Sequence, residues 1–81
     1  MYTVYALFSK EYNKIYIGYT SDIDQRIIAH NHPENNGWTR KFAPWILVYT
    51  ETFPIKSDAM KREKQLKSSQ GRKFVWGQVK F

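Results

Sequence analysis

The chain has 81 residues, 17% of them aromatic, and it contains no cysteine. This length allows one small domain, and the lack of cysteine excludes disulfide bonds and thiolate metal sites as the means of stabilising it. Thirteen Lys and Arg against seven Asp and Glu give a net charge of +6, which attracts polyanions, nucleic acid most commonly and anionic membrane surfaces next.

No apolar run approaches the roughly 18–20 residues that are needed to cross a membrane. The N-terminal segment lacks the basic start of a signal peptide, and it reaches Lys10 and Glu11 too soon for one. We therefore expect a soluble, cytoplasmic protein that binds a polyanion other than a membrane.

An antiparallel hairpin is predicted at the N-terminus. Residues 2–9 and 14–20 are rich in β-branched and aromatic residues, and the second segment alternates as a strand does. The polar residues 10–13 between them suit a turn. The two segments are therefore expected to pair as neighbouring antiparallel strands.

The register of this hairpin decides what surrounds Gly18. If Ser9 pairs with Lys14, then Tyr5 lies opposite Gly18, and Tyr16 is its diagonal neighbour on the same face. Glycine weakens a strand, so its place beside two tyrosines needs a reason. One interpretation is that Gly18 leaves space for a ligand or a substrate backbone. The other is a β-bulge, with the tyrosines packed in the core.

A helix is predicted over residues 21–31, with Ser21 as its N-cap. Its helical spacing places Arg26 and His30 one turn apart, on the face that the isoleucines turn inward. Arg can bind phosphate with two parallel hydrogen bonds, and His can exchange a proton near neutral pH. The alternative is that Arg26 extends past the isoleucines to solvent and that His30 caps the helix end.

Residues 32–38 contain Pro and Gly and are predicted to form a loop. The continuous apolar run within residues 44–51 predicts a strand that is buried on both faces. Pro44 would stand at the first position of this strand, where its missing N–H does least harm.

Two further helices complete the predicted fold. Residues 56–69 form the first, with Ser57 as its N-cap, and a break at residues 68–71 ends it. Residues 72–81 form a short terminal helix with Val75 facing inward. The order β-β-α-β-α-(α) is typical of a small α/β (α+β) fold, in which helices cover a three-stranded sheet.

Glu63 interrupts the apolar pattern of the first of these helices, because it lies near the middle of a stripe that contains Ala59, Met60 and Leu66. A carboxylate there stays charged only if a cation or hydrogen-bond donors compensate for its lost hydration. Three interpretations are open: an ion pair with Arg26 or a lysine, a place in water at the rim of the stripe, or the binding of a hard divalent cation.

Several basic residues could contact a nucleic-acid backbone, which gives affinity that depends on salt but not on sequence. They are Arg40, Lys41, Lys61, Arg62, Lys64, Lys67, Arg72 and Lys73. The other interpretation is an ordinary solvated basic face. Trp38 lies among polar residues, where it could stack on an unpaired base or anchor the loop in the core.

Together these residues resemble the GIY-YIG nuclease domain, in particular its small single-domain bacterial members. Residues 3–5, TVY, stand where the family has GIY and keep its Tyr, and residues 16–18 are an intact YIG. Arg26 and His30 lie in a block similar to the family's next motif, and Glu63 stands at its acidic position. The resemblance covers nearly the whole chain.

The resemblance implies a single domain over residues 1–81, with a three-stranded antiparallel sheet flanked by helices. It also implies hydrolysis of DNA phosphodiester bonds with one divalent ion, Mg²⁺ or Mn²⁺. Glu63 would be the metal ligand, and Arg26 would hold the scissile phosphate and stabilise its developing charge. These roles suit the groups, because Mg²⁺ keeps several waters and the charge of Arg does not titrate.

The other catalytic residues that the resemblance implies are Tyr5, Tyr16 and His30. Tyr5 would be the general base or would orient the attacking water, Tyr16 would assist through hydrogen bonds, and His30 would support the transfer of protons. Gly18 would keep the pocket open. A phenol with a pKa of about 10 is a poor base at neutral pH unless nearby cations lower it, so the identity of the base stays open.

One position departs from the family, which often has an Asn after the acidic residue; this chain has no Asn after Glu63. The main hypothesis is a metal-dependent DNA endonuclease that selects DNA structure rather than sequence, works in repair or recombination, and acts alone, with a partner protein or as a homodimer. The alternatives are a non-catalytic nucleic-acid-binding module on the same scaffold and a basic adaptor for an acidic protein or a membrane surface.

Overall fold

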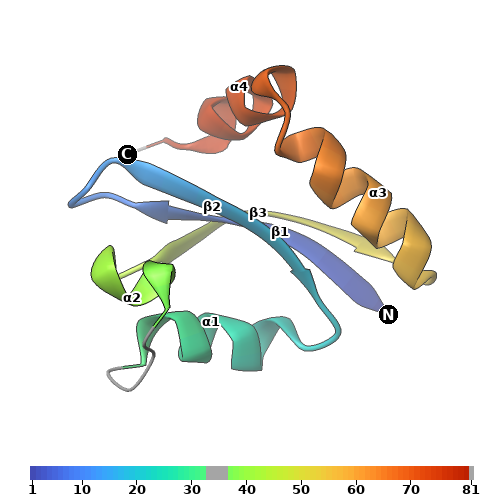
Figure 1. Cartoon of the computed structure of the whole chain (residues 1–81), viewed down its shortest axis with the longest axis horizontal. Helices are drawn as coiled ribbons and strands as arrows, with labels where there is room; N and C mark the ends of the chain where they lie inside the picture. Colours follow the sequence, from blue (N-terminus) through green and yellow to red (C-terminus); the bar gives the residue numbers. More distant parts are fainter. Residues whose placement is uncertain (33–36, 81) are drawn as a thin grey trace.

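A three-stranded antiparallel sheet with the strand order β2-β1-β3 lies at the centre of the molecule (Figure 1). The computed structural model describes residues 1–32 and 37–80, without the side chain of Trp38. Its elements are β1 (Tyr2–Ser9), β2 (Lys14–Thr20), α1 (Ile23–Asn31), α2 (Trp38–Lys41), β3 (Ile46–Phe53), α3 (Lys56–Leu66) and α4 (Ser69–Gln78). The predicted antiparallel sheet and the predicted order of elements are confirmed, and the structure adds the short α2.

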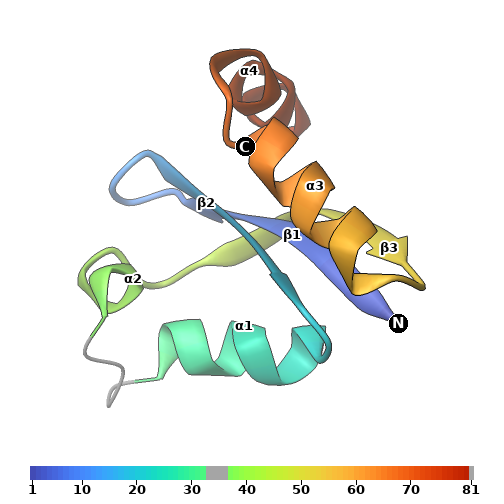
Figure 2. The ribbon, with the colours of Figure 1, turned by 45° about the vertical axis from the view of Figure 1, so that its right-hand side comes forward.

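Helices cover both faces of the sheet, α1 and α2 on one side and α3 and α4 on the other (Figure 1 and Figure 2). Because side chains alternate along a strand, β1 contributes to a separate apolar cluster on each face. The cluster on the α1 side contains Tyr5, Leu7 and Trp45. The cluster on the α3 side contains Val4, Ala6, Phe8, Ile15, Ile17, Ala59, Leu66 and Val75.

The hairpin has the register that places Tyr5 beside Gly18, which is one possibility that the sequence allows. Ser9 pairs with Lys14, and Tyr5 lies opposite Gly18. The pairing of β1 with β2 runs without a shift from Thr3 to Ser9, so the β-bulge considered at Gly18 is absent. Tyr5 therefore projects beside the glycine, on the face that α1 covers.

The strand that was expected to be buried on both faces is an edge strand. β3 pairs with β1 on one side, and Ile46 and Leu47 at its start are 38% and 39% exposed. Pro44 lies outside the strand, two residues before it begins. The strand that is buried on both faces is β1, which lies between the other two. An apolar run indicates contact with a core, but it does not give the strand's place in the sheet.

The predicted N-caps are wrong by one residue or more. α1 is capped by Asp22 rather than Ser21, and the Asp22 side chain accepts a hydrogen bond from the backbone N–H of Gln25 at 3.2 Å. Both residue types suit an N-cap, but the helix begins at Ile23, so the residue directly before it is Asp22. α3 begins at Lys56, so Ser57 lies inside the helix and does not cap it.

The break between the last two helices lies earlier than predicted. α3 ends at Leu66, and α4 begins at Ser69 instead of at residue 72. Ser68 is the N-cap of α4, and its hydroxyl accepts a hydrogen bond from the N–H of Gly71 at 3.2 Å. Val75 is fully buried, as predicted. Within the described residues, no helix is long and apolar enough to cross a membrane.

Candidate active site

A single cleft of about 360 Å³ brings together side chains from β1, β2, α1 and α3. Its lining includes the predicted site residues Tyr5, Tyr16, Gly18, Arg26 and Glu63. The remaining predicted catalytic residue, His30, lies behind Tyr5 and is hydrogen-bonded to it. The fold therefore places all of the residues that the family resemblance selects in one region.

Tyr5 and His30 form a buried polar pair. The Tyr5 hydroxyl lies 2.9 Å from Nε2 of His30, and the other ring nitrogen, Nδ1, lies 3.0 Å from the hydroxyl oxygen of Thr39. Tyr5 is 1% exposed and His30 is 7% exposed. The His30 side chain thus reaches Tyr5 and Thr39, whereas the prediction of a helix cap had it turned to the end of α1.

Burial shifts the pKa of both groups toward the neutral form. Burial is the main cause that raises the pKa of the Tyr5 phenol, and the neighbouring Tyr16 raises it further, against the opposing charge of Arg26. Burial also lowers the pKa of His30, and the positive charge of Arg26 lowers it further. Near neutral pH the pair is therefore a protonated phenol beside an uncharged imidazole.

Gly18 leaves room for the Tyr5 phenol, because it has no side chain. A Cβ atom at this position would lie 2.8 Å from the Tyr5 hydroxyl oxygen and 3.2 Å from Cε1 of Tyr16. The glycine thus allows the phenol to lie against the backbone of β2. Tyr5 is packed in the core, as one of the two interpretations had it, and it occupies part of the space beside Gly18; the rest of that space opens into the cleft.

Replacing Gly18 with Ala is expected to destabilise the protein by about 1–3 kcal/mol, as overpacked cores do. The added methyl group would push the Tyr5 ring away from His30, because the buried ring cannot move into solvent. Urea unfolding measures the cost. In a Tyr5→Phe background the same substitution should cost less, since the nearest contacting atom is gone. An equal cost in both backgrounds would contradict this explanation.

Arg26 is on α1 and Glu63 is on α3, helices that cover opposite faces of the sheet (Figure 1), and both residues line the same cleft. The Glu63 side chain is 21% exposed, and its Oε2 lies 3.5 Å from Nζ of Lys67, the C-cap residue of α3. The first of the three interpretations was an ion pair with Arg26 or a lysine, and the structure shows it with a lysine. The predicted stripe is narrower than expected, because Met60 is 47% exposed. Glu63 therefore lies at the edge of the apolar face, where it meets the cleft.

Comparison with known proteins identifies the family of this chain. The model of the GIY-YIG catalytic domain matches residues 1–75. This chain belongs to the GIY-YIG family. The matched range contains every residue that lines the cleft, and the fold of this chain is that of a GIY-YIG nuclease domain.

Individual relatives of this GIY-YIG chain carry the name UPF0213 protein. One from Staphylococcus haemolyticus is 40% identical over 65 residues, which is 80% of this chain and 78% of that protein. One from Natronomonas pharaonis is 43% identical over 54 residues, 67% of this chain and 64% of that protein. The solution NMR structure of a UPF0213 protein from Bacillus halodurans is 35% identical, has a TM-score of 0.56, and is matched over 95% of this chain and 84% of its own.

The cleft of this GIY-YIG chain is also lined by residues that were not predicted as site residues: Tyr2, Tyr19, Thr20, Ser21 and Lys56. Thr39, which contacts His30 from outside the cleft lining, was not predicted either. Lys56 lines the cleft from the first turn of α3. A lysine there is unfavourable to the helix dipole, and this was a signal that could have pointed to it. Thr39 carries no such signal, because its contact with His30 joins α1 to α2 and no local pattern in the sequence relates the two.

The predicted nucleic-acid contacts lie on helices at both faces of the GIY-YIG sheet (Figure 2). Arg40 and Lys41 are exposed on α2, and Lys67 is the C-cap residue of α3. The others of the set are on α3 (Lys61, Arg62 and Lys64) and on α4 (Arg72 and Lys73). The side chain of Trp38 lies outside the described residues, so its two interpretations stay open. Contact with nucleic acid stays a prediction for this set.

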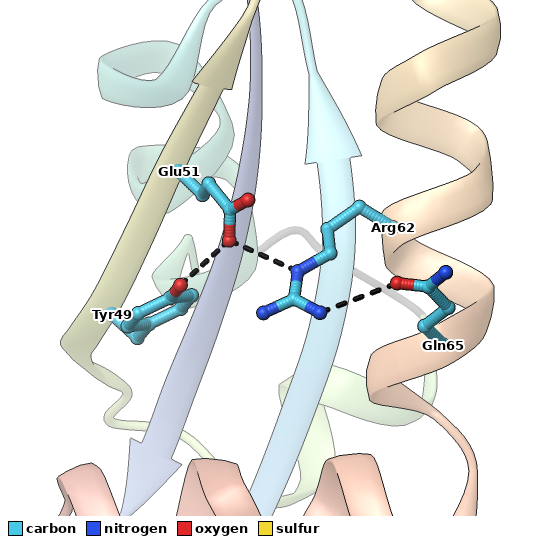
Figure 3. Close-up of polar contacts among 4 residues, drawn as sticks. All are labelled: Tyr49, Glu51, Arg62 and Gln65. Atoms are coloured by element: carbon cyan, nitrogen blue, oxygen red, sulfur yellow. Dashed lines mark hydrogen bonds and ion pairs between the residues drawn. The ribbon is translucent and has the colours of Figure 1, made fainter.

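Arg62 differs from the other basic residues because it is part of a polar network with β3 (Figure 3). Its Nε donates to Oε2 of Glu51 at 3.0 Å, and Nη1 donates to Oε1 of Gln65 at 3.3 Å. The Tyr49 hydroxyl donates to the same Glu51 oxygen at 2.6 Å. These hydrogen bonds, that of Tyr49 first, lower the pKa of the Glu51 carboxyl.

Replacing Arg62 with Gln is expected to cost about 1 kcal/mol of stability, because it breaks the link between α3 and β3. Lys64→Gln is the matched control, since it removes the same charge from an exposed position of the same helix. That change should stay within about 0.5 kcal/mol. Urea unfolding compares the two variants, and equal losses would show that the network does not stabilise the fold.

Proposed function

We propose that the protein is a divalent-metal-dependent DNA endonuclease that selects DNA structure rather than sequence and works in DNA repair or recombination. The observation that carries the proposal is that Tyr5, Arg26 and Glu63 line one cleft in a chain of the GIY-YIG family. Hydrolysis of a phosphodiester needs a path for the proton of water and neutralised charge on the phosphate and leaving oxygen. A cytoplasmic location, and action alone, with a partner protein or as a homodimer, belong to the same proposal.

Glu63 fits a single Mg²⁺ or Mn²⁺ ion. Among the residues that the structure describes, no group of three or more His, Cys, Asp or Glu could form a cage for a metal. One carboxylate in an open cleft instead suits a hard cation that keeps most of its waters, as Mg²⁺ does. When bound, the ion would supply positive charge beside the phosphate and a more acidic water.

Tyr5 and His30 provide a path for the proton of the attacking water. Because its pKa is raised, Tyr5 keeps its proton at rest and can hand it on. As the water oxygen bonds to phosphorus, one water proton passes to the Tyr5 oxygen, and the proton of Tyr5 passes to Nε2 of His30. The phosphorus bond to the leaving oxygen breaks, and that oxygen takes a proton from solvent. Arg26 neutralises the charge that develops on the phosphate.

A non-catalytic nucleic-acid-binding module is the second candidate, and the lack of an Asn after Glu63 favours it. Under this hypothesis the basic residues give affinity, and Glu63 has no role at the cleft. A carboxylate that faces a polyanion weakens binding unless a cation lies between them. The position of Glu63 in the cleft therefore supports the endonuclease more than the module.

The test is cleavage of supercoiled plasmid and a branched oligonucleotide in Mg²⁺, in Mn²⁺ and in EDTA. We expect nicking that needs the metal and that falls by about 10²–10⁴-fold in Tyr5→Phe, which loses the proton path. Tyr12→Phe, at an exposed tyrosine, is purified in the same way and controls for a contaminating nuclease. Salt-sensitive binding without cleavage in either metal would favour the binding module.

A further inference from the structure

The segment that carries Thr39 is fastened to the sheet through its backbone. The indole N–H of Trp45 donates to the carbonyl of Thr39 at 2.7 Å, and the Ser9 hydroxyl donates to the carbonyl of Phe42 at 2.7 Å. Asn31 in turn holds Trp45, since its side chain accepts from the Trp45 N–H at 2.7 Å and donates to the Trp45 carbonyl at 3.2 Å. The position of Thr39 is therefore fixed from both ends of the segment.

Thr39 meets His30 in a buried environment. Both residues are 7% exposed, and the Thr39 hydroxyl lies 3.0 Å from Nδ1 of His30. The imidazole also packs against the ring of Tyr16, with 4.7 Å between ring centroids. One ring nitrogen is thus held by Thr39 while the other faces Tyr5.

An uncharged imidazole has one nitrogen that donates and one that accepts, and the partner of one nitrogen decides the state of the other. In serine proteases a carboxylate fixes the histidine in this way. A hydroxyl oxygen can also accept the N–H. At a position this buried, a neutral hydroxyl avoids the desolvation cost that a carboxylate would have.

We propose that Thr39 is a positioning residue: it accepts the Nδ1–H of His30 and so holds His30 in the tautomer whose unprotonated Nε2 accepts from Tyr5. This inference rests on the proposed function, because it specifies which proton His30 is ready to receive. Thr39 does not touch the substrate. Its role is to keep the imidazole in the one state that completes the path from water through Tyr5.

The first test is direct observation of the His30 tautomer by long-range ¹H–¹⁵N NMR of the whole chain. We expect the proton on Nδ1 in the wild type and in Thr39→Ser, which keeps the hydroxyl, and a mixture or the other tautomer in Thr39→Val. Cleavage should fall by about 10–100-fold in Thr39→Val and stay within about threefold in Thr39→Ser, with DNA affinity unchanged in both.

A proton on Nε2 in the wild type would overturn the inference, and this result needs no variant to fold. A wild-type tautomer and cleavage rate in a folded Thr39→Val would overturn it as well. The two proposals fail separately. If the wild type does not cut DNA but the tautomer changes in Thr39→Val and not in Thr39→Ser, the positioning of His30 stands and the endonuclease proposal fails.

Discussion

Replacing Glu63 with Gln is expected to abolish DNA cleavage and to leave DNA affinity unchanged or raised. Glu63 is the one carboxylate among the described residues that line the cleft. An amide has nearly the same shape but lacks the charge with which a hard cation is held. Because a bound ion contributes several kcal/mol to the transition state, the rate should fall by about 10³-fold or more. Plasmid nicking and salt-dependent binding measure the two effects.

Glu11→Gln is the matched control for this experiment, because it removes the same charge from an exposed position in the turn between β1 and β2. Both variants gain one unit of net positive charge, so any rise in affinity from long-range attraction should be shared. The loss of cleavage should belong to Glu63→Gln alone. Thermal unfolding shows whether the lost ion pair with Lys67 matters for the fold. Cleavage by Glu63→Gln at the wild-type rate would remove Glu63 from the mechanism.

The hairpin could be predicted because its local signals agree. A short polar turn joins two alternating strands, and a slip of one residue would move every side chain to the other face. The existence of the hairpin follows from these signals, whereas its register stayed conditional on the pairing of Ser9 with Lys14, which the structure shows. Helical spacing likewise placed Arg26 and His30 on the side of α1 that faces the site.

The errors arise where the tertiary structure decides between equal local choices. Ser21 and Asp22 are both good N-caps, and their sequence gives no reason to prefer the second. The apolar run in β3 is compatible with a central strand or with an edge strand, and only the pairing with β1 shows which it is. The hydrogen bond between Thr39 and His30 links α2 to α1, and no periodicity in the sequence relates these two residues.

Replacing Gly71 with Ala is expected to be the most destabilising of the changes considered, by about 3 kcal/mol or more. The sequence suggested that Gly71 ends a helix, but it lies within the first turn of α4, where that helix packs against the end of α3. A Cβ atom there would lie 2.1 Å from the carbonyl oxygen of Gln65 and 2.4 Å from Cα of Leu66. Both atoms are backbone, so the helices would have to separate.

Gly77→Ala is the control for this prediction, since it adds the same methyl group to the same helix. At Gly77 nothing lies within 4 Å of the added Cβ, so only helix propensity changes, and stability should rise by about 0.5–1 kcal/mol. In a domain of this size each kcal/mol shifts the melting temperature by about 4–8 °C, so the two variants should move in opposite directions by a clear margin. If Gly71→Ala melts with Gly77→Ala, then α3 and α4 do not touch as closely as these distances require. If Gly71→Ala melts far below Gly77→Ala, the close contact at Gly71 stabilises the packing of α4 against α3. This packing buries Leu66 and Val75 in one core cluster, and α3 is also the helix that carries Glu63 to the cleft.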